Sequence, residues 1–267
     1  MRTATNGGRL DLPATQHVLC ERPPDPRLVW EKDHRMAAEK YRLLAHRVRV
    51  KKAQKPILRI LITSAVPGEG KTATAANLAI VLARNRQRVL LVDGDLRKPD
   101  MHDVMGLPAE PGLGEVLAGE ASLDQALRCI DPVGLYCMPA GRSRDNPVSL
   151  LEGNALRDTL AATEEAFEWV IIDSPPLNQF ADAHCIASVA DGVVLVIRWN
   201  LTPREELERA LTELKTMPLL GLVLNGCDES RQAYYYNYYY STHRRSEPGQ
   251  TAAADGQATA PRPEGTR

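Results

Sequence analysis

The chain has 267 residues, 43% of them hydrophobic, which allows one substantial buried core with a small appendage but hardly two large domains. Its formal net charge of -1 gives no reason to expect nucleic acid or an anionic membrane as a partner. The cysteines are widely spread, with no CxxC pair and no histidines at zinc spacing, so they are predicted to be reduced thiols in a cytosolic protein (Cys20, Cys129, Cys137, Cys185 and Cys227).

The two ends of the chain are predicted to be disordered tails. Residues 1–30 are polar and interrupted by prolines, as in ERPPDPR, and residues 241–267 contain almost no bulky apolar side chain. Such segments cannot offset the entropy that is lost on ordering. The N-terminus also lacks the apolar centre of a signal peptide, and no apolar run approaches the ~20 residues of a membrane-spanning helix. We expect another protein to mediate any contact with a membrane.

Residues 31–230 are predicted to form one doubly wound α/β domain. A helical pattern runs from Glu31 to Lys52, and runs of branched apolar residues follow at 57–65, 88–95, 134–140, 169–176, 191–199 and 219–226. These runs are continuous rather than alternating, which is typical of a mostly parallel sheet with helices on both faces. Helical patterns fill the gaps at 71–87, 146–167, 181–190 and 203–217, with a weaker pair within 101–130.

A glycine-rich segment, SAVPGEGKT, lies between the first of these strands and the next helix. Glycines allow backbone N–H groups to surround phosphate oxygens, and the start of a helix adds partial positive charge. Lys71 is expected to reach the β and γ phosphates, and Thr72 to place its hydroxyl on Mg2+. The strict motif has glycine where this chain has Ala65, and a glycine-rich turn that merely contains a lysine is the alternative. The segment predicts a P-loop NTPase that binds nucleotide through Pro67, Gly68, Glu69, Gly70, Lys71, Thr72 and Ala73.

Three aspartates follow two other predicted strands at their carboxyl ends. Asp93 and Asp95 lie in VLLVDGDLRKP, and Asp173 lies in WVIIDSPP. Ligands of open parallel α/β sheets bind outside these strand ends, so the carboxylates are expected to converge on the metal of a bound nucleotide. For each aspartate alone, a helix cap or a turn is the alternative. Arg97 is expected to order the turn of Asp93 and Asp95 or to touch phosphate, with a surface position as the alternative.

SAVPGEGKT, LLVDGDLRKP and VIIDSPP resemble the Walker A, Walker A′ and Walker B motifs of the bacterial tyrosine kinases, which are cytoplasmic kinases of capsule and exopolysaccharide export. The resemblance extends through MHDVMGL, GLGEVLAG, MPAGRSRDNPVSLL, DAHCIASVADGVVLVIR and GLVLNG, over about residues 35–240. It implies a tyrosine kinase domain at 31–230 with ATP and Mg2+ as cofactors and Lys71 as a catalytic residue. It also implies Asp93 as the base and Asp95 and Asp173, with Thr72, around the metal; the choice of base between Asp93 and Asp95 stays open. Asn225 resembles the amide that reads adenine in related folds, and a turn at a strand end is its alternative.

Residues 234–240, YYYNYYY, hold six of the eight tyrosines of the chain and fall in the tail predicted at 231–267. A phenol has a pKa near 10 and needs a positioned base before it can attack a phosphoryl group. An aromatic edge strand or a stacking surface is the alternative, although tyrosine on both faces of a strand does not suit it. The resemblance implies autophosphorylation between subunits, with the phosphoacceptors Tyr234, Tyr235, Tyr236, Tyr238, Tyr239 and Tyr240.

The resemblance also implies partners. These are other copies of the chain in a ring, a protein-tyrosine phosphatase, and a separate transmembrane polysaccharide co-polymerase adaptor that recruits the kinase to the inner face of the plasma membrane; nucleic acid is not expected. The family motif E-x-x-R-x-x-R between ring subunits is matched by Glu39 and Arg42 but not by Ala45, and Arg47 is a possible substitute. A MinD/ParA-like regulatory ATPase switch of the partitioning and cell-division group, without kinase activity, is the main alternative, although Val66 replaces its signature lysine. A catalytically dead scaffold is the other alternative.

Overall fold

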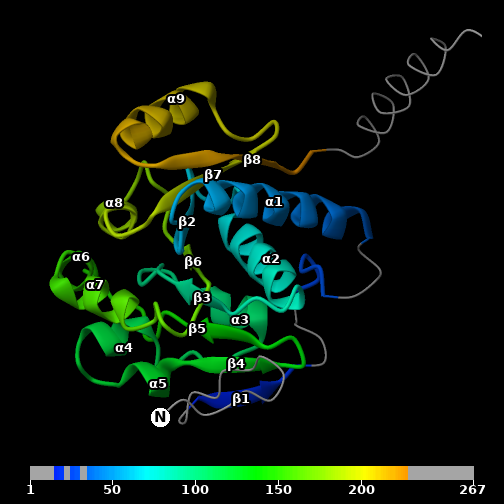
Figure 1. Ribbon diagram of the computed structural model, residues 1–267. Coiled ribbons are helices and arrows are strands. Elements are labelled where there is room, and N and C mark those ends of the chain that lie inside the picture. Colours follow the sequence, from blue (N-terminus) through cyan, green and yellow to red (C-terminus); the bar gives the residue numbers. More distant parts are fainter. Residues whose placement is uncertain (1–14, 21–24, 31–34, 228–267) are drawn as a thin grey trace, which may run out of the picture. The chain divides into compact units, whose positions relative to one another are not determined.

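The computed structural model describes residues 15–20, 25–30 and 35–227, and the chain divides into two units, Met1–Gly226 and Cys227–Arg267. In the described part of the first unit, the strands form one sheet in the order β1-β4-β5-β3-β6-β2-β7-β8 (Figure 1). All neighbouring strands are parallel except β4 and β5. The strands are β1 (Gln16–Leu19), β2 (Arg59–Ser64), β3 (Val89–Asp93), β4 (Arg128–Asp131), β5 (Leu135–Met138), β6 (Trp169–Asp173), β7 (Gly192–Arg198) and β8 (Leu219–Asn225).

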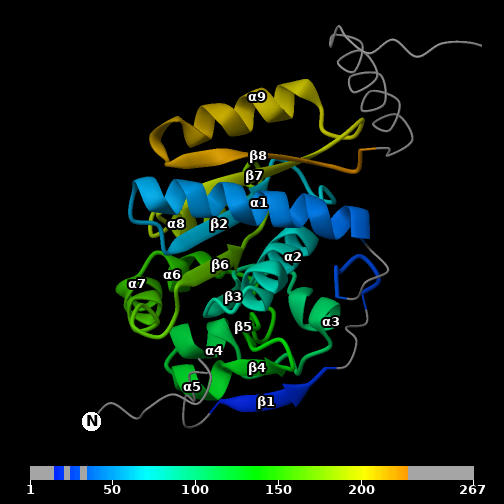
Figure 2. The ribbon, with the colours of Figure 1, turned by 45° about the vertical axis from the view of Figure 1, so that its right-hand side comes forward.

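Helices cover both faces of this sheet, as predicted. Buried side chains of α1 (Arg35–Gln54), α2 (Lys71–Arg84) and α3 (Met101–Met105) form one core with one face, and Figure 2 shows these helices on the same side. The other helices contribute to a second core on the opposite face: α4 (Leu113–Leu117), α5 (Leu123–Ala126), α6 (Val148–Leu151), α7 (Asn154–Ala161), α8 (Ala181–Ala187) and α9 (Arg204–Glu213), which continues into η2 (Leu214–Thr216). Within the described residues, no helix combines the length and the apolarity needed to cross a bilayer.

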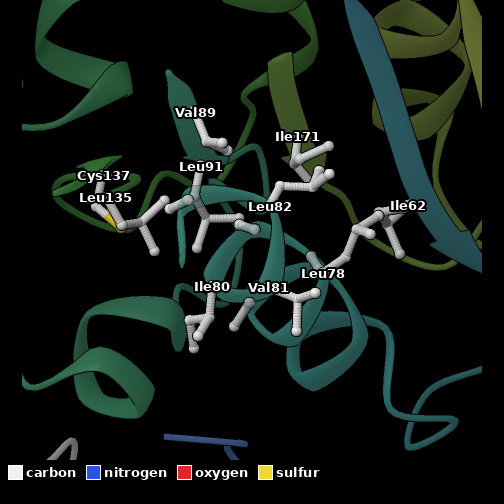
Figure 3. Close-up of a cluster of buried hydrophobic side chains, with 14 of the residues drawn as sticks. Ile62, Leu78, Ile80, Val81, Leu82, Val89, Leu91, Leu135, Cys137 and Ile171 are labelled. Carbon is white, nitrogen blue, oxygen red and sulfur yellow. The ribbon is translucent and has the colours of Figure 1, made fainter. Parts of the chain in front are cut away.

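The helix α2 lies at the centre of the first core. Its residues from Thr72 to Ala83 are all buried, which explains why its sequence is apolar or small on every side rather than amphipathic. Figure 3 shows Leu78 and Leu82 reaching toward the strands, within the cluster that also holds Leu91 and Ile171. This packing fixes the start of α2, and therefore the glycine-rich segment before it, against the sheet.

The six predicted strands are confirmed as β2, β3, β5, β6, β7 and β8, but β1 and β4 were not predicted. The predicted helix at 146–167 divides into α6 and α7, which are separated by Glu152 and Gly153. Both missed strands have only four residues. Two of the four residues in each are polar or charged, so neither forms an apolar run, whereas the equally short β5 is apolar throughout.

The prediction of a disordered tail at 1–30 is wrong for the described residues 15–20 and 25–30. The strand β1 pairs with β4, while Val29 and Trp30 are buried on α2. The Val29 N–H donates to the side-chain oxygen of Asn77 at 2.7 Å, and the Arg84 guanidinium donates to the Trp30 carbonyl and lies over its ring. A few apolar residues among prolines are therefore ordered by contacts with distant elements. The tail predicted at 231–267 lies outside the described residues.

We expect Leu82→Ala to lower the free energy of unfolding by about 2–5 kcal/mol, because Leu82 is fully buried and its removal leaves a cavity between α2 and the sheet. Leu43→Ala is the matched control, since Leu43 is 51% exposed on α1. Its effect should stay within about 0.5 kcal/mol. Urea denaturation of both variants measures the difference, and equal losses would contradict this account of the core.

Candidate active site

The segment between β2 and α2 has the backbone of a phosphate-binding loop. Gly68 and Gly70 have φ values of 79° and 92°, which side chains other than glycine rarely adopt. A Cβ at Gly70 would also lie only 2.1 Å from the amide nitrogen of Asn225. Both glycines are therefore required by the path of the loop, which leads directly into the first turn of α2.

Four of the predicted catalytic or metal-binding side chains meet beside this loop. The Lys71 ammonium lies 3.4 Å from Asp95 Oδ2 and 3.8 Å from Asp173 Oδ2. The Thr72 hydroxyl donates to Asp173 Oδ2 at 2.6 Å. Asp95 follows β3 and Asp173 ends β6, so the convergence results from neighbouring parallel strands that end at the same edge of the sheet.

Asp93 is placed differently from Asp95. It has no exposed surface, and its two carboxylate oxygens accept the N–H groups of Asp95 at 3.0 Å and Met101 at 3.4 Å. Gly94 donates its N–H to the Asp173 carbonyl at 2.9 Å, in a place where a Cβ would come within 2.6 Å of that oxygen. Asp93 thus holds the turn that presents Asp95 to Lys71. Which of the two acts as a base stays a prediction.

The carboxylates of this site have unusual proton affinities. Burial, with the neighbouring Asp173 charge, raises the pKa of Asp93 well above its usual range. Burial also raises the pKa of Asp173 to about 6, although Lys71 and Thr72 oppose this change. For Lys71, burial alone would lower the pKa, but the Asp173 and Asp95 carboxylates raise it above its ordinary value. Lys71 is therefore charged at neutral pH, and the two aspartates favour a proton or a cation nearby.

The site fits a hard divalent cation. Asp173 Oδ1 is buried and has no hydrogen-bond partner among the described residues. An unpaired carboxylate oxygen beside a hydroxyl and a second carboxylate supplies the oxygen ligands that Mg2+ prefers. Thr72, Asp95 and Asp173, the predicted metal set, are the residues that would hold it.

Residues from β7 and β8 clasp the phosphate loop, and only one of them was predicted to belong to the site. The buried Glu69 side chain accepts the Val66 N–H at 3.0 Å and the Thr202 hydroxyl. Thr202 Oγ1 accepts the Arg198 N–H at 2.8 Å, and the Arg198 guanidinium donates to the Gly68 carbonyl at 3.0 Å. Arg198 ends β7 and Thr202 lies in the turn that follows; neither belongs to a sequence motif, so this position is the one signal that the sequence offers for them.

Asn225, at the end of β8, completes this clasp. Its amide nitrogen donates to the Glu69 carbonyl at 2.9 Å, and its oxygen accepts the Gly226 N–H at 2.8 Å. One amide hydrogen is therefore used to hold the loop, and contact with adenine stays a prediction. The predicted phosphoacceptor tyrosines at 234–240 lie outside the described residues.

Arg97 forms an ion pair rather than pointing to the phosphate loop. Its Nε and Nη2 lie 2.7 Å and 2.9 Å from the two oxygens of the buried Asp182 carboxylate. Its Nη1 also donates to the Asp145 carbonyl at 3.2 Å. Arg97 therefore joins the segment after β3 to α8, and its role in ordering the turn of Asp93 and Asp95 stays a prediction.

The helix α1 carries only part of the motif E-x-x-R-x-x-R. Glu39 and Arg42 form an exposed ion pair with each other. Ala45 is fully buried against the first core, so an arginine would not fit at this position. Arg47 is exposed on the same helix.

The pKa of Asp173 predicts a pH effect on stability. In metal-free protein, the folded state keeps a proton on Asp173 that the unfolded chain releases near pH 3.8. The free energy of unfolding should therefore fall by about 2–3 kcal/mol through this group as pH rises from about 4 to about 6. Asp173→Asn should lack this contribution, and Asp158→Asn, exposed on α7, should retain it. Urea denaturation at a series of pH values in chelator tests this, and parallel curves for wild type and Asp173→Asn would refute it.

Thr202→Val tests the clasp, because it removes the hydroxyl that Glu69 accepts while keeping the shape of the side chain. We expect a loss of about 1–3 kcal/mol in the free energy of unfolding, since a buried carboxylate oxygen loses its donor. Affinity for a fluorescent ATP analogue should fall as well. Thr212→Val is the control, because its exposed hydroxyl donates to the Glu208 carbonyl of its own helix and takes no part in holding the loop among the described residues. Unchanged nucleotide affinity in Thr202→Val would show that the clasp does not position the loop.

Comparison with known proteins agrees with this geometry. The family model described as an AAA domain matches residues 59–218. Tyrosine-protein kinase YwqD of Bacillus subtilis (strain 168) is 37% identical over 207 residues, which are 77% of this chain and 86% of YwqD. The chain spans only 27% and 24% of the length of two longer relatives that are also named as tyrosine-protein kinases.

Solved structures give the same result. The kinase domain of Escherichia coli tyrosine kinase ETK aligns with a TM-score of 0.67 at 26% identity, over 82% of this chain and 80% of that one. The cell division ATPase MinD of Pyrococcus furiosus aligns less extensively, with a TM-score of 0.55 at 28% identity, over 62% of this chain and 71% of that one. These matches confirm the predicted P-loop fold and the predicted family. The chain belongs to the bacterial tyrosine kinases, within the AAA domain family.

Proposed function

We propose that this protein is an ATP- and Mg2+-dependent protein-tyrosine kinase that phosphorylates the tyrosines at 234–240 on another copy of itself. The observation that carries the proposal is the cluster of Lys71, Thr72, Asp95 and Asp173 beside the glycine loop. Such a cluster can hold the phosphates of ATP and leave the terminal phosphorus open to a nucleophile. The acceptor residues themselves rest on the sequence alone.

The chain's own residues supply positioning and charge for phosphoryl transfer. The loop amides and the Lys71 ammonium would neutralise the β and γ phosphates, and bound Mg2+ would add charge neutralisation at the same oxygens. A carboxylate, Asp93 or Asp95, would take the phenolic proton as the new bond from oxygen to the γ phosphorus forms. The bond from that phosphorus to the bridging oxygen of the β phosphate breaks, and ADP leaves. Asp95 needs no rearrangement to approach Lys71, whereas Asp93 would first have to give up its backbone hydrogen bonds.

Similarity to a protein of polysaccharide synthesis supports a proposal for the biological setting. A relative of this chain in Rhizobium meliloti is named succinoglycan biosynthesis transport protein ExoP, and it is 33% identical over 184 residues. We place this chain in the cytoplasm, where a separate co-polymerase adaptor recruits it to the inner face of the plasma membrane. A protein-tyrosine phosphatase would reverse its phosphorylation. Each phosphate adds about -1.5 to -2 charges to the tail. Repulsion between such tails would disperse an assembly of subunits and so regulate polymer synthesis and export.

A regulatory ATPase switch is the second candidate, because the MinD structure shares the fold. This candidate would hydrolyse ATP without modifying protein. Val66 stands at the place of the lysine that marks the switch ATPases, and its N–H is bound by Glu69. The two functions differ in one product, which is phosphotyrosine.

The test is a mixture of two full-length variants with ATP and Mg2+. Lys71→Ala should lose at least about a hundredfold of its kinase activity, because a main charge on the phosphates is gone. A variant with phenylalanine at all six tail tyrosines keeps the active site but offers no acceptor. Incubated together, the pair should produce phosphotyrosine on the Lys71→Ala chain, and mass spectrometry should place it within 234–240.

Lys215→Ala, which changes an exposed lysine far from the loop, is the matched control and should phosphorylate itself at the wild-type rate. Phosphate release without phosphotyrosine in the wild type would favour the regulatory switch. Labelling of the wild type but not of the mixed pair would show transfer within one chain and refute transfer between copies.

A further inference from the structure

A second group of metal-ligating side chains lies on the sheet edge formed by β1 and β4. His17 of β1 pairs in register with Cys129 of β4, and Asp131 comes two residues after Cys129. Alternate residues of a strand share a face, so these three side chains project from the same face. The order of the strands places β5, β3 and β6 between this edge and β2, which leads into the phosphate loop. Figure 1 shows β1 and β4 together at that edge.

The three side chains are close enough to share one ion. One ligand atom of each lies within 4.8 Å of the other two, and His17 Nδ1 is 2.9 Å from Asp131 Oδ2. Tetrahedral zinc with nitrogen, sulfur and oxygen ligands needs separations of roughly 3.4–3.6 Å between ligand atoms. Side-chain movements of about 1 Å would therefore form the site without changing the strand pairing.

The chemistry of the donors favours zinc over Mg2+. A thiolate and an imidazole are ligands for a borderline-soft ion, whereas Mg2+ prefers oxygen. Cys129 is fully buried, and a bare thiolate there would be costly. One thiolate and one carboxylate balance the +2 charge of Zn2+, so the metal centre that they form carries no net charge. The His17 and Asp131 side chains are 42% and 21% exposed, which leaves the fourth position open to water.

We propose that His17, Cys129 and Asp131 form a Zn2+ site that fastens β1 to the edge of the sheet. Binding joins the metal to His17 Nδ1, the Cys129 sulfur and an Asp131 oxygen; the thiol proton and the hydrogen on His17 Nδ1 pass to solvent, and the neutral ring keeps its one hydrogen on Nε2. The hydrogen bond between His17 Nδ1 and Asp131 Oδ2 holds two of the ligands in place before the metal arrives. The site is independent of the nucleotide site and of the proposed kinase activity.

Cobalt titration of the full-length, metal-free protein without nucleotide tests this site. We expect one Co2+ per chain, with the visible bands of tetrahedral cobalt and a near-ultraviolet charge-transfer band from sulfur, both removed by added Zn2+. The phosphate loop and its aspartates contain no sulfur, so the charge-transfer band distinguishes the two sites. Zn2+ should also raise the Tm of the wild type, because it binds only the folded edge.

Cys129→Ser should abolish the charge-transfer band, and His17→Ala should weaken Co2+ binding at least about tenfold and remove the Tm shift. Cys185→Ser and His46→Ala are the matched controls, and both should behave as the wild type. Should Cys129→Ser fail to fold, His17→Ala decides the question, because His17 is half-exposed. Absence of the charge-transfer band in folded wild type, or unchanged Co2+ affinity in His17→Ala, would overturn the proposal.

Discussion

The candidate active site depends on one partly buried ammonium group among three buried carboxylates. Lys71 faces Asp95 and Asp173, while Asp93 lies behind them, so negative charge exceeds positive charge at the edge of the sheet. Charges removed from water interact strongly, and the excess is relieved either by a proton or by a cation. A metal ion therefore competes with protons for the same oxygens, and its binding releases protons. The imbalance that destabilises the metal-free site is also what makes it attractive to a divalent cation.

The position of the phosphate loop is decided by elements that are distant in sequence. Glu69 is held by Thr202 after β7, and both Arg198 and Asn225 bond to carbonyl groups of the loop. These residues reach the loop because β7 lies beside β2 in the sheet and β8 lies beside β7. The loop is thus supported on one side by its own helix and on the other by the last two strands. Nucleotide affinity should respond to changes at either support, even where the glycines and Lys71 are untouched.

Much of this arrangement could be predicted because its signals are local. Continuous apolar runs indicated the six mutually parallel strands from β5 to β8 in the order of the sheet, and the glycine loop with its following lysine indicated Lys71 and Thr72. The general rule for parallel sheets then brought Asp95 and Asp173 to the same place. Thr202 could not be predicted, since one hydroxyl in a turn has no pattern. The sequence could not show that Asp93 is buried and bonded to backbone while Asp95 faces Lys71. Two aspartates separated by one glycine look alike until the path of the backbone is known.

The N-terminal segment is ordered by its pairing with the edge of the sheet, although its composition alone predicts disorder. Without β1, the backbone of β4 would be exposed along the edge of the sheet, and an open edge invites pairing with other chains. Residues 25–30 then run against α2, where Asn77 and Arg84 bond to their backbone. Each contact is small, but together they order a stretch whose own composition predicts disorder. The folded part that the structure describes therefore extends before α1 to β1, which is held by its pairing with β4, by the His17–Asp131 hydrogen bond and by the packing of Val18 against the first core.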